Sequence, residues 1–252
     1  MTDPEKRSSS ACVKCPGTTC APAIGADDPM PSLEEAPSYC PMRRMPEVME
    51  EVGAEYQRAD VREFARLASV QEAECYELTA DGIRTRFPRL EETIQFAGKC
   101  NYRKIGMAFC VGLKQEARMV TEILSAKGFD VTTVNCKVGA VPKESIGVEP
   151  EEKIVPPVLM ETMCNPVAQA EVLNAEQVDL AIMLGLCVGH DTLFLKYIRP
   201  PCTILAVKDR VLGHNPLAAA YLSKGPYYSR MRIESDKTGS GEKVTLPDNV
   251  RE

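Results

Sequence analysis

The apolar run from Val178 to Cys187, VDLAIMLGLC, restricts the fold more than any other feature of the sequence. Asp179 is its one charged residue, so the element that it forms must be buried on both faces. A short run of this kind is typical of a strand in a parallel sheet that helices cover on both sides. His190 follows the run after two residues, and the chain has only two histidines. This strand therefore brings a thiol and an imidazole to one end of the sheet.

Three further strand patterns alternate with helical patterns along the same region. Strands are predicted at 104–110, 129–136, 178–187 and 202–209, and helices at 113–128, 165–176, 190–198 and 215–222. Asn165 is a suitable N-cap, and Pro166 occupies the first helical position after it. The alternation predicts an α/β fold, a Rossmann-like open parallel sheet of about four strands with flanking helices. Ligands of such sheets bind outside the carboxyl ends of the strands.

The rest of the chain differs from this α/β pattern. Residues 1–46 are rich in proline and cysteine and lack a periodic apolar pattern, so we expect a metal to order them. Helical spacing begins at Glu47, continues to Leu78 and breaks at Asp81-Gly82, and a second short helix is predicted at 89–100. The predicted organisation is a cysteine-rich metal-binding arm (1–46), a helical segment (47–99), the Rossmann-like domain (100–224) and a polar tail (225–252).

Composition restricts the class of protein. The chain has 252 residues and a net charge of −6, which disfavours nucleic acid as a partner. No run is long and apolar enough to cross a bilayer, and MTDPEKRSSS at the start lacks the apolar core of a signal peptide. We therefore expect a cytoplasmic protein with no membrane partner. In that reducing compartment, eleven cysteines indicate metal binding or redox chemistry rather than a disulfide framework.

The first cysteine set lies in the N-terminal arm. CVKCPGTTC spaces Cys12, Cys15 and Cys20 as C-x2-C-x4-C, and SYCPM adds Cys40. The close pair can chelate one ion, and the other two thiols complete a tetrahedral shell. Structural zinc and an iron–sulfur cluster both accept four thiolates, and the spacing alone does not choose between them.

The second set follows from the predicted topology. Cys110, Cys136 and Cys187 end three strands, and Cys164 precedes a helix, so all four thiols belong to the carboxyl edge. One cysteine at a strand end is commonly a core residue, but four at one edge indicate a shared metal or cofactor site. His190 enters the next helix, and Asp209 and His214 follow the last strand. We predict the four thiols and His190 as metal ligands; His190, His214 and Asp209 are candidate catalytic residues. The remaining cysteines, which are Cys75, Cys100 and Cys202, are interpreted as structural.

Five long motifs resemble the DUF1847 family. They are GMAFCVGL, NCKVG, MCNPVAQAEVLN, GLCVGHDTLFLKY and VKDRVLGHNPLAAAY, and the resemblance extends to CVKCPGTTC near the start. It implies a small protein of the kind found mostly in anaerobic bacteria and archaea and often labelled metal-binding. It also marks as signature positions Cys110, Cys136, Cys164, Cys187, His190 and His214, without assigning a reaction to them.

Three functional hypotheses remain open. The first is an iron–sulfur redox protein with one or two clusters of the 4Fe–4S type, whose partner is a redox protein or a small-molecule substrate. Lys208 and Arg210 would then supply positive charge for the cluster or an anionic substrate. The second is a non-catalytic zinc protein for metal storage, sensing or delivery. The third is a thiol enzyme, which needs fewer cysteines. CVGLKQE after the first strand has one glycine and no phosphate-binding pattern, so we do not expect a nucleotide cofactor. The sequence leaves open catalysis and homo-oligomer formation.

Overall fold

The computed structural model describes residues 9–226, except 18, 23, 24 and 26, together with 228 and 231. The chain divides into two compact units between Thr85 and Arg86. We call them the N-terminal unit and the α/β unit and describe each by itself. Most of the predicted polar tail, 225–252, lies outside the described residues. In the part of the chain that the structure describes, no helix has the length and apolar character needed to span a membrane.

The N-terminal unit is built from short elements. Along the chain these are η1 (Cys12–Lys14), η2 (Leu33–Glu35), α1 (Pro41–Arg44), α2 (Pro46–Glu55), α3 (Ala59–Glu74), β1 (Tyr76–Thr79) and β2 (Gly82–Thr85). Helices α2 and α3 confirm the helical pattern that begins at Glu47. Its predicted continuation to Leu78 is wrong, because β1 and β2 form an antiparallel hairpin in which Leu78 is paired with Ile83. Ala80 and Asp81 form the turn of the hairpin, and Gly82, which begins β2 opposite Thr79, has a positive φ of 116° that glycine adopts without strain.

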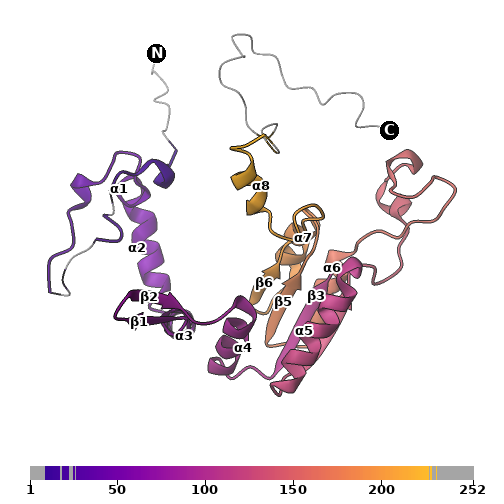
Figure 1. The fold of residues 1–252 in the computed structure, drawn as a ribbon, viewed down its shortest axis with the longest axis horizontal. Coiled ribbons are helices and arrows are strands. Elements are labelled where there is room, and N and C mark those ends of the chain that lie inside the picture. Colours follow the sequence, from indigo (N-terminus) through magenta and orange to yellow (C-terminus); the bar gives the residue numbers. More distant parts are fainter. Residues whose placement is uncertain are drawn as a thin grey trace, which may run out of the picture. The chain divides into compact units, whose positions relative to one another are not determined.

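The α/β unit contains a four-stranded sheet with flanking helices (Figure 1). Its elements are α4 (Arg89–Lys99), β3 (Lys104–Phe109), η3 (Val111–Leu113), α5 (Lys114–Ala126), β4 (Asp130–Asn135), η4 (Lys143–Ile146), η5 (Pro150–Glu152), α6 (Pro166–Ala175), β5 (Leu180–Leu184), α7 (His190–Tyr197), β6 (Cys202–Ala206) and α8 (Leu217–Leu222). All neighbouring strands are parallel, in the order β4-β3-β5-β6. The predicted Rossmann-like sheet is confirmed.

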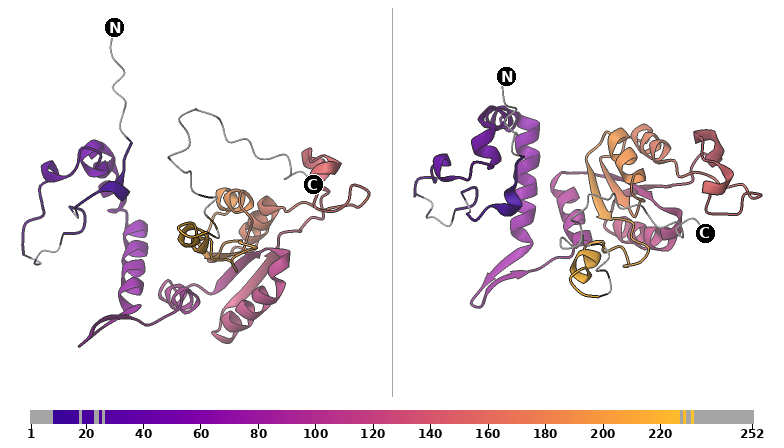
Figure 2. Two further views of the ribbon diagram at one scale, coloured as in Figure 1. Left: turned by 45° about the horizontal axis from the view of Figure 1, so that its top comes forward. Right: turned by 90° about the horizontal axis from the view of Figure 1, so that it is seen from above.

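The two faces of the sheet have separate cores, as alternating strand residues require. On β3, Ile105, Met107 and Phe109 pack with residues of α4 and α5. Ala108, on the opposite face, belongs to the core that contains residues of α6 and the fully buried Phe194 of α7. Figures 1 and 2 show the helices on both sides of this sheet. The continuous apolar run of β5 is explained by this double coverage.

The strand order creates a switch point between β3 and β5. The chain leaves β3 for β4 on one side and later returns to β5 on the other. Right-handed crossovers then place the helices that follow β3 and β5 on opposite faces of the sheet. Ligands of this fold class bind at the carboxyl ends of the strands near such a switch point. Cys110 directly follows β3 and Cys187 lies three residues after β5, so both thiols lie at this end of the sheet.

The strands are shorter than predicted at their carboxyl ends. β5 ends at Leu184 because Gly185 has a φ of 65°, and a side chain there would collide with Leu113. β6 ends at Ala206, three residues before the predicted end at 209. The thiols and charged groups therefore lie in the loops just beyond the strands.

Helix α4 belongs to the α/β unit. The observed boundary between the units, at 85/86, therefore lies earlier in the sequence than the predicted boundary at 99/100. Its buried Ala97, with Leu90 and Ile94, packs in the core beneath α5. Arg89 also donates hydrogen bonds to Ile204 O and Thr203 Oγ1 on β6, at 2.8 and 3.0 Å. α4 thus covers one face of the sheet and binds the exposed edge of β6.

We predict that Gly106→Ala destabilises the α/β unit. A Cβ atom at Gly106 would lie 2.9 Å from Leu173 and 3.0 Å from Val178, closer than packed side chains allow. We expect a loss of about 1–3 kcal/mol in the free energy of unfolding, measured in urea. Gly98→Ala on the exposed side of α4 is the matched control, because a Cβ there meets nothing within 4 Å. It should stabilise by up to about 1 kcal/mol through helix propensity. Equal effects of the two variants would contradict this packing.

Candidate functional site

Three of the four edge thiols are in one cluster at the carboxyl end of the sheet. The sulfur of Cys136 lies 3.7 Å from that of Cys164, and it also interacts with the thiol of Cys110. Cys136 Sγ accepts a hydrogen bond from Val111 N at 3.3 Å. These segments are far apart in the sequence, and the order β4-β3 brings them together. We call Cys110, Cys136 and Cys164 the thiol cluster.

Backbone contacts fix the position of each thiol. Cys110 N donates to Leu184 O on β5 at 3.2 Å, and Asn165 N donates to Cys136 O at 2.7 Å. Asn165 also caps α6 as predicted, because its Oδ1 accepts from Ala168 N at 3.0 Å. The thiol cluster is therefore held by the sheet and the start of α6 before any ligand is present.

Gln169 on α6 holds together the ends of the two strands that precede Cys110 and Cys136. Its side chain is fully buried, and Nε2 donates to Phe109 O and Val134 O, at 3.1 and 2.8 Å. These carbonyls belong to β3 and β4, next to the thiols of the cluster. Leaving a buried amide donor unpaired is costly, so the two bonds favour one spacing of the strand ends.

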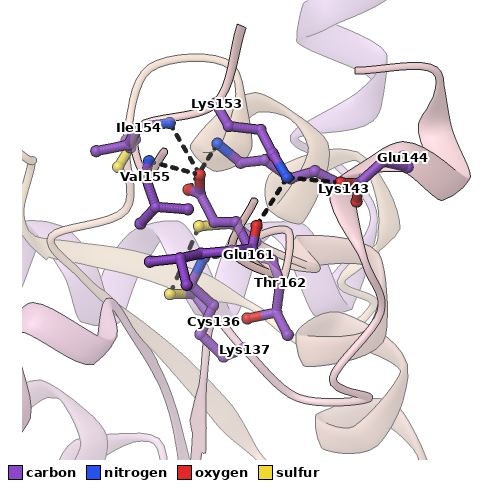
Figure 3. A network of polar contacts seen from close by, with 12 residues as sticks. Cys136, Lys137, Lys143, Glu144, Lys153, Ile154, Val155, Glu161 and Thr162 are labelled. Atoms are coloured by element: carbon purple, nitrogen blue, oxygen red, sulfur yellow. Dashed lines mark hydrogen bonds and ion pairs between the residues drawn. The ribbon is translucent and has the colours of Figure 1, made fainter. Parts of the chain in front are cut away.

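The long segment 137–163 connects Cys136 to Cys164, and ion pairs and hydrogen bonds within the segment stabilise it. Lys143 pairs with Glu161 at 2.8 Å, and Glu161 Oε2 also accepts from Ile154 N and Val155 N (Figure 3). Lys153, whose side chain is 2% exposed, donates to Glu144 and to loop carbonyls. The main cause that holds the pKa of Glu161 below its usual value is the hydrogen bond from Lys143.

Contacts between the two ends of segment 137–163 hold these ends together. Pro142 and Thr162 form an isolated β-bridge, and Lys137 Nζ donates to Thr162 O (Figure 3). Met163 N donates to Val141 O at 2.8 Å. The segment leaves at Cys136 and returns at Cys164, so these contacts hold the two thiols side by side.

Positive groups surround the thiols. Lys208 Nζ interacts with Cys110, and a Cβ placed at Gly112 would lie 3.8 Å from Lys208 Nζ and 3.9 Å from Cys110 Sγ. Arg210 Nη2 donates to Cys187 Sγ at 2.9 Å. Lys137 acts electrostatically on Cys164. Positive charge favours the thiolate form that metals and electrophiles require.

The thiols of the cluster differ in their pKa values. The pKa of Cys110 is lowered to about 5, chiefly by the hydrogen bond with Cys136 and further by Gly112 N and Lys208. The pKa of Cys164 is lowered to about 6, again chiefly by Cys136, with help from Lys137 and His190. The pKa of Cys136 is raised, chiefly because its hydrogen bonds with Cys110 and Cys164 favour its protonated form. The contacts within the cluster therefore favour ionisation of Cys110 and Cys164 over ionisation of Cys136.

Cys187 and His190 lie at the rim of the cluster. Burial raises the pKa of Cys187, Arg210 opposes the shift, and Cys110 and Cys164 act on it electrostatically. His190 begins α7, with its N–H bonded to Cys187 O at 3.0 Å, and it acts electrostatically on Cys164. His190 Nδ1 is buried without a hydrogen-bond partner among the described residues. The structure thus brings both predicted ligands beside the cluster.

Asp209 and His214 form contacts within their own turn. His214 Nδ1 accepts from Asp209 N at 3.1 Å, and Asp209 Oδ1 accepts from Val211 N and Leu212 N, at 2.9 and 2.7 Å. His214 has a φ of 65°, which this turn imposes. In the described part of the chain, the side chains of Asp209 and His214 thus stabilise this turn. The turn contains Arg210, which contacts Cys187.

The N-terminal thiols lie partly together. Cys15 N donates to Cys12 O in the η1 turn at 3.0 Å. Tyr39 Oη donates to Lys14 O at 2.8 Å, which brings the segment before Cys40 beside the same turn. Cys12 and Cys20 are exposed, and Cys15 and Cys40 are partly exposed. The structure therefore juxtaposes the segments that carry Cys12, Cys15 and Cys40.

The cysteines at the edge of the sheet are the residue type that binds a thiolate-ligated metal, and one pair of sulfurs has the separation that such a metal requires. Two thiolates on one tetrahedral zinc ion, each about 2.3 Å from the metal, are separated by about 3.8 Å. The separation of 3.7 Å between Cys136 and Cys164 agrees with this value. Among the described residues, no group of three or more Cys, His, Asp or Glu side chains is placed so that it could hold a metal ion. Cys187 Sγ accepts a hydrogen bond from Arg210 Nη2.

Sequence reasoning identified the thiols, His190 and the two cations after β6, but missed other parts of the site. Lys137, Gln169 and Gly112 were not predicted. The signal for Gln169 was a polar residue on the inner face of a helix that is otherwise apolar there. The ion pairs of segment 137–163 join residues whose contacts depend on the folded path, so no local pattern indicates them.

The chain belongs to the family described as "Protein of unknown function (DUF1847)", whose model matches residues 40–205. It is also similar to an uncharacterized protein of Methanocaldococcus jannaschii, with 39% identity over 188 residues. That match covers 75% of this chain and 89% of the relative. No solved structure matches the chain. The matched region contains the thiol cluster, Cys187 and His190.

We predict that Cys136 sets the acidity of its two neighbours in the metal-free protein. Thiolate ultraviolet absorbance should develop below neutral pH and should be reduced in Cys110→Ser and Cys164→Ser variants. Cys136→Ala should move the absorbance to higher pH, because both thiolates lose the contact that lowers their pKa most. Cys202→Ala should leave this part of the titration unchanged, because burial raises the pKa of Cys202 to about 11. A titration that Cys136→Ala does not shift would contradict the assignment.

Proposed function

We propose that this protein is an iron–sulfur redox protein whose carboxyl-edge site uses Cys110, Cys136, Cys164 and Cys187 as ligands. The observation that carries the proposal is the thiol cluster, in which two low-pKa thiols flank Cys136 beside Cys187. An all-thiolate donor set selects iron–sulfur clusters, zinc or Cu(I). When bound, an iron–sulfur cluster supplies reversible one-electron chemistry.

The surrounding residues suit that role. Lys208, Lys137 and Arg210 offset the negative charge of several thiolates, and hydrogen bonds to cluster sulfurs are among the groups that tune a reduction potential. His190 has a buried nitrogen available at the rim, where it could ligate metal or donate a hydrogen bond. Gly112 lies next to both Cys110 Sγ and Lys208 Nζ, which are each within 4 Å of the position that a Cβ of residue 112 would occupy.

The N-terminal thiols complete the proposed redox protein. Cys12, Cys15, Cys20 and Cys40 would hold a second centre that exchanges electrons with a partner protein. We place the protein in the cytoplasm as part of this proposal, because a reducing compartment keeps thiols available as metal ligands.

A second candidate is a zinc protein for metal storage, sensing or delivery. The 3.7 Å separation of Cys136 and Cys164 favours it, because this is the spacing of two ligands on one ion. In a 4Fe–4S cluster, each ligand thiolate binds a different iron atom, so the ligand sulfurs are farther apart. The two candidates share their ligands and differ in the metal.

We predict that protein purified without oxygen contains iron and acid-labile sulfide and is brown. Cys136→Ser and Cys164→Ser should each lower the metal content of the α/β site, whereas Cys202→Ser should not, because Cys202 begins β6 at the opposite edge. Cys12→Ser should remove metal from the N-terminal set alone. Elemental analysis and a sulfide assay on each variant provide the measurement.

A colourless protein with stoichiometric zinc and no sulfide would overturn the redox proposal in favour of the zinc candidate. Unchanged metal content in both Cys136→Ser and Cys164→Ser would exclude the α/β site under either candidate.

A further inference from the structure

The contact between Cys136 and Cys164 has the geometry of a disulfide in its reduced state. The two sulfurs lie 3.7 Å apart, and a disulfide requires about 2.0 Å. The backbones are held next to each other by Asn165 N and Cys136 O, at 2.7 Å, and by the bridge between Pro142 and Thr162. Small side-chain rotations therefore suffice to close the remaining distance.

We propose that Cys136 and Cys164 form a reversible disulfide and that this bond closes the carboxyl-edge site to metal. The oxidant is a low-molecular-weight disulfide such as oxidised glutathione. The second part of the inference rests on the proposed function, because it assigns both thiols as ligands. The first part concerns the thiols alone.

The exposure of the two thiols sets the order of the reaction. Cys164 is partly exposed, whereas Cys136 is 2% exposed, so an oxidant from solvent reaches Cys164 first. The Cys164 thiolate attacks one sulfur of the oxidant, whose S–S bond breaks, and one glutathione thiolate leaves. Cys136 then gives up its proton to solvent and attacks Cys164 Sγ, which releases the second glutathione thiolate. Two protein thiols are oxidised, and one external disulfide is reduced to two thiols.

Cys110 is the competing partner for Cys136, and the structure disfavours it as the entry point. Its side chain is 9% exposed, and Gly112 N and Lys208 contact its sulfur. Cys187 is held by Arg210. Within the cluster, Cys164 is thus the thiol that is accessible to solvent and also contacts a buried thiol, Cys136.

Peptide mapping can test the inference directly, because trypsin and Glu-C together place the four thiols in separate peptides. Cys110 falls in 105–114, Cys136 in 128–137, Cys164 in 162–171 and Cys187 in 177–196. Full-length metal-free protein is treated with oxidised glutathione, blocked with an alkylating reagent and digested without reductant. We expect a cross-link between 128–137 and 162–171 that disappears on reduction.

Variants define the specificity of the cross-link. It should persist in Cys110→Ser, Cys187→Ser and Cys202→Ser and be lost in Cys136→Ser and in Cys164→Ser. In Cys136→Ser, glutathione should remain on Cys164. A dominant cross-link between 105–114 and 128–137 would overturn the inference. Stable glutathione on Cys164 of the otherwise unchanged protein, with no cross-link, would overturn it as well.

Zinc uptake tests the consequence for the site. In a full-length Cys12→Ser, Cys15→Ser background, Zn²⁺ should bind the reduced protein, fail to bind the glutathione-oxidised protein, and bind again after reduction. Equal Zn²⁺ binding by the cross-linked and reduced forms would overturn closure of the site. A cross-link in a protein that takes up no Zn²⁺ when reduced would contradict the metal proposal and leave the disulfide standing. Zn²⁺ uptake without any cross-link would contradict the disulfide alone.

Discussion

The contact of the Cys136 sulfur with its two neighbouring thiols is the interaction on which the rest of the site depends. It lowers the pKa of Cys110 and Cys164, and it places two sulfurs at the separation of ligands on one ion. This contact requires β4 beside β3 and the return of segment 137–163 to the start of α6. The strand order and the partly buried ion pairs of that segment therefore support the site, although no contact of Lys143 or Glu161 with a thiol is seen in the described structure.

The surroundings of the thiols balance charge and burial. Thiolates next to one another repel, and burial opposes their ionisation. Lys137, from the loop after β4, and Lys208 and Arg210, from the loop after β6, act in the opposite sense. A cation that replaces the proton of Cys136 would relieve the same repulsion, which is why a group of this composition favours metal. Metal binding and proton loss are then linked.

Much of the α/β unit could be predicted from local patterns. The apolar runs and the Asn-Pro helix start at 165–166 depend on neighbouring residues, and the structure confirms both. The hairpin after α3 was missed because Leu78 also fits helical spacing, and tertiary context rather than periodicity decided its state. The thiols could be assigned to one edge because parallel strands share a direction. The roles of Gln169, Lys137 and the turn of Asp209 and His214 depend on contacts between distant segments, which the sequence does not show.

The central claim is that the thiol cluster and Cys187 hold one metal centre at the switch point of the sheet. Anomalous diffraction from crystals of protein purified without oxygen, recorded at the iron and zinc absorption edges, tests this most directly. The account predicts anomalous iron density among the sulfurs of Cys110, Cys136, Cys164 and Cys187, with an iron atom within bonding distance, about 2.3 Å, of each ligand sulfur. A single zinc peak bonded to both Cys136 and Cys164 would support the zinc candidate instead. Well-ordered density for these four side chains with no anomalous peak among them, in crystals whose metal content is accounted for elsewhere, would contradict it.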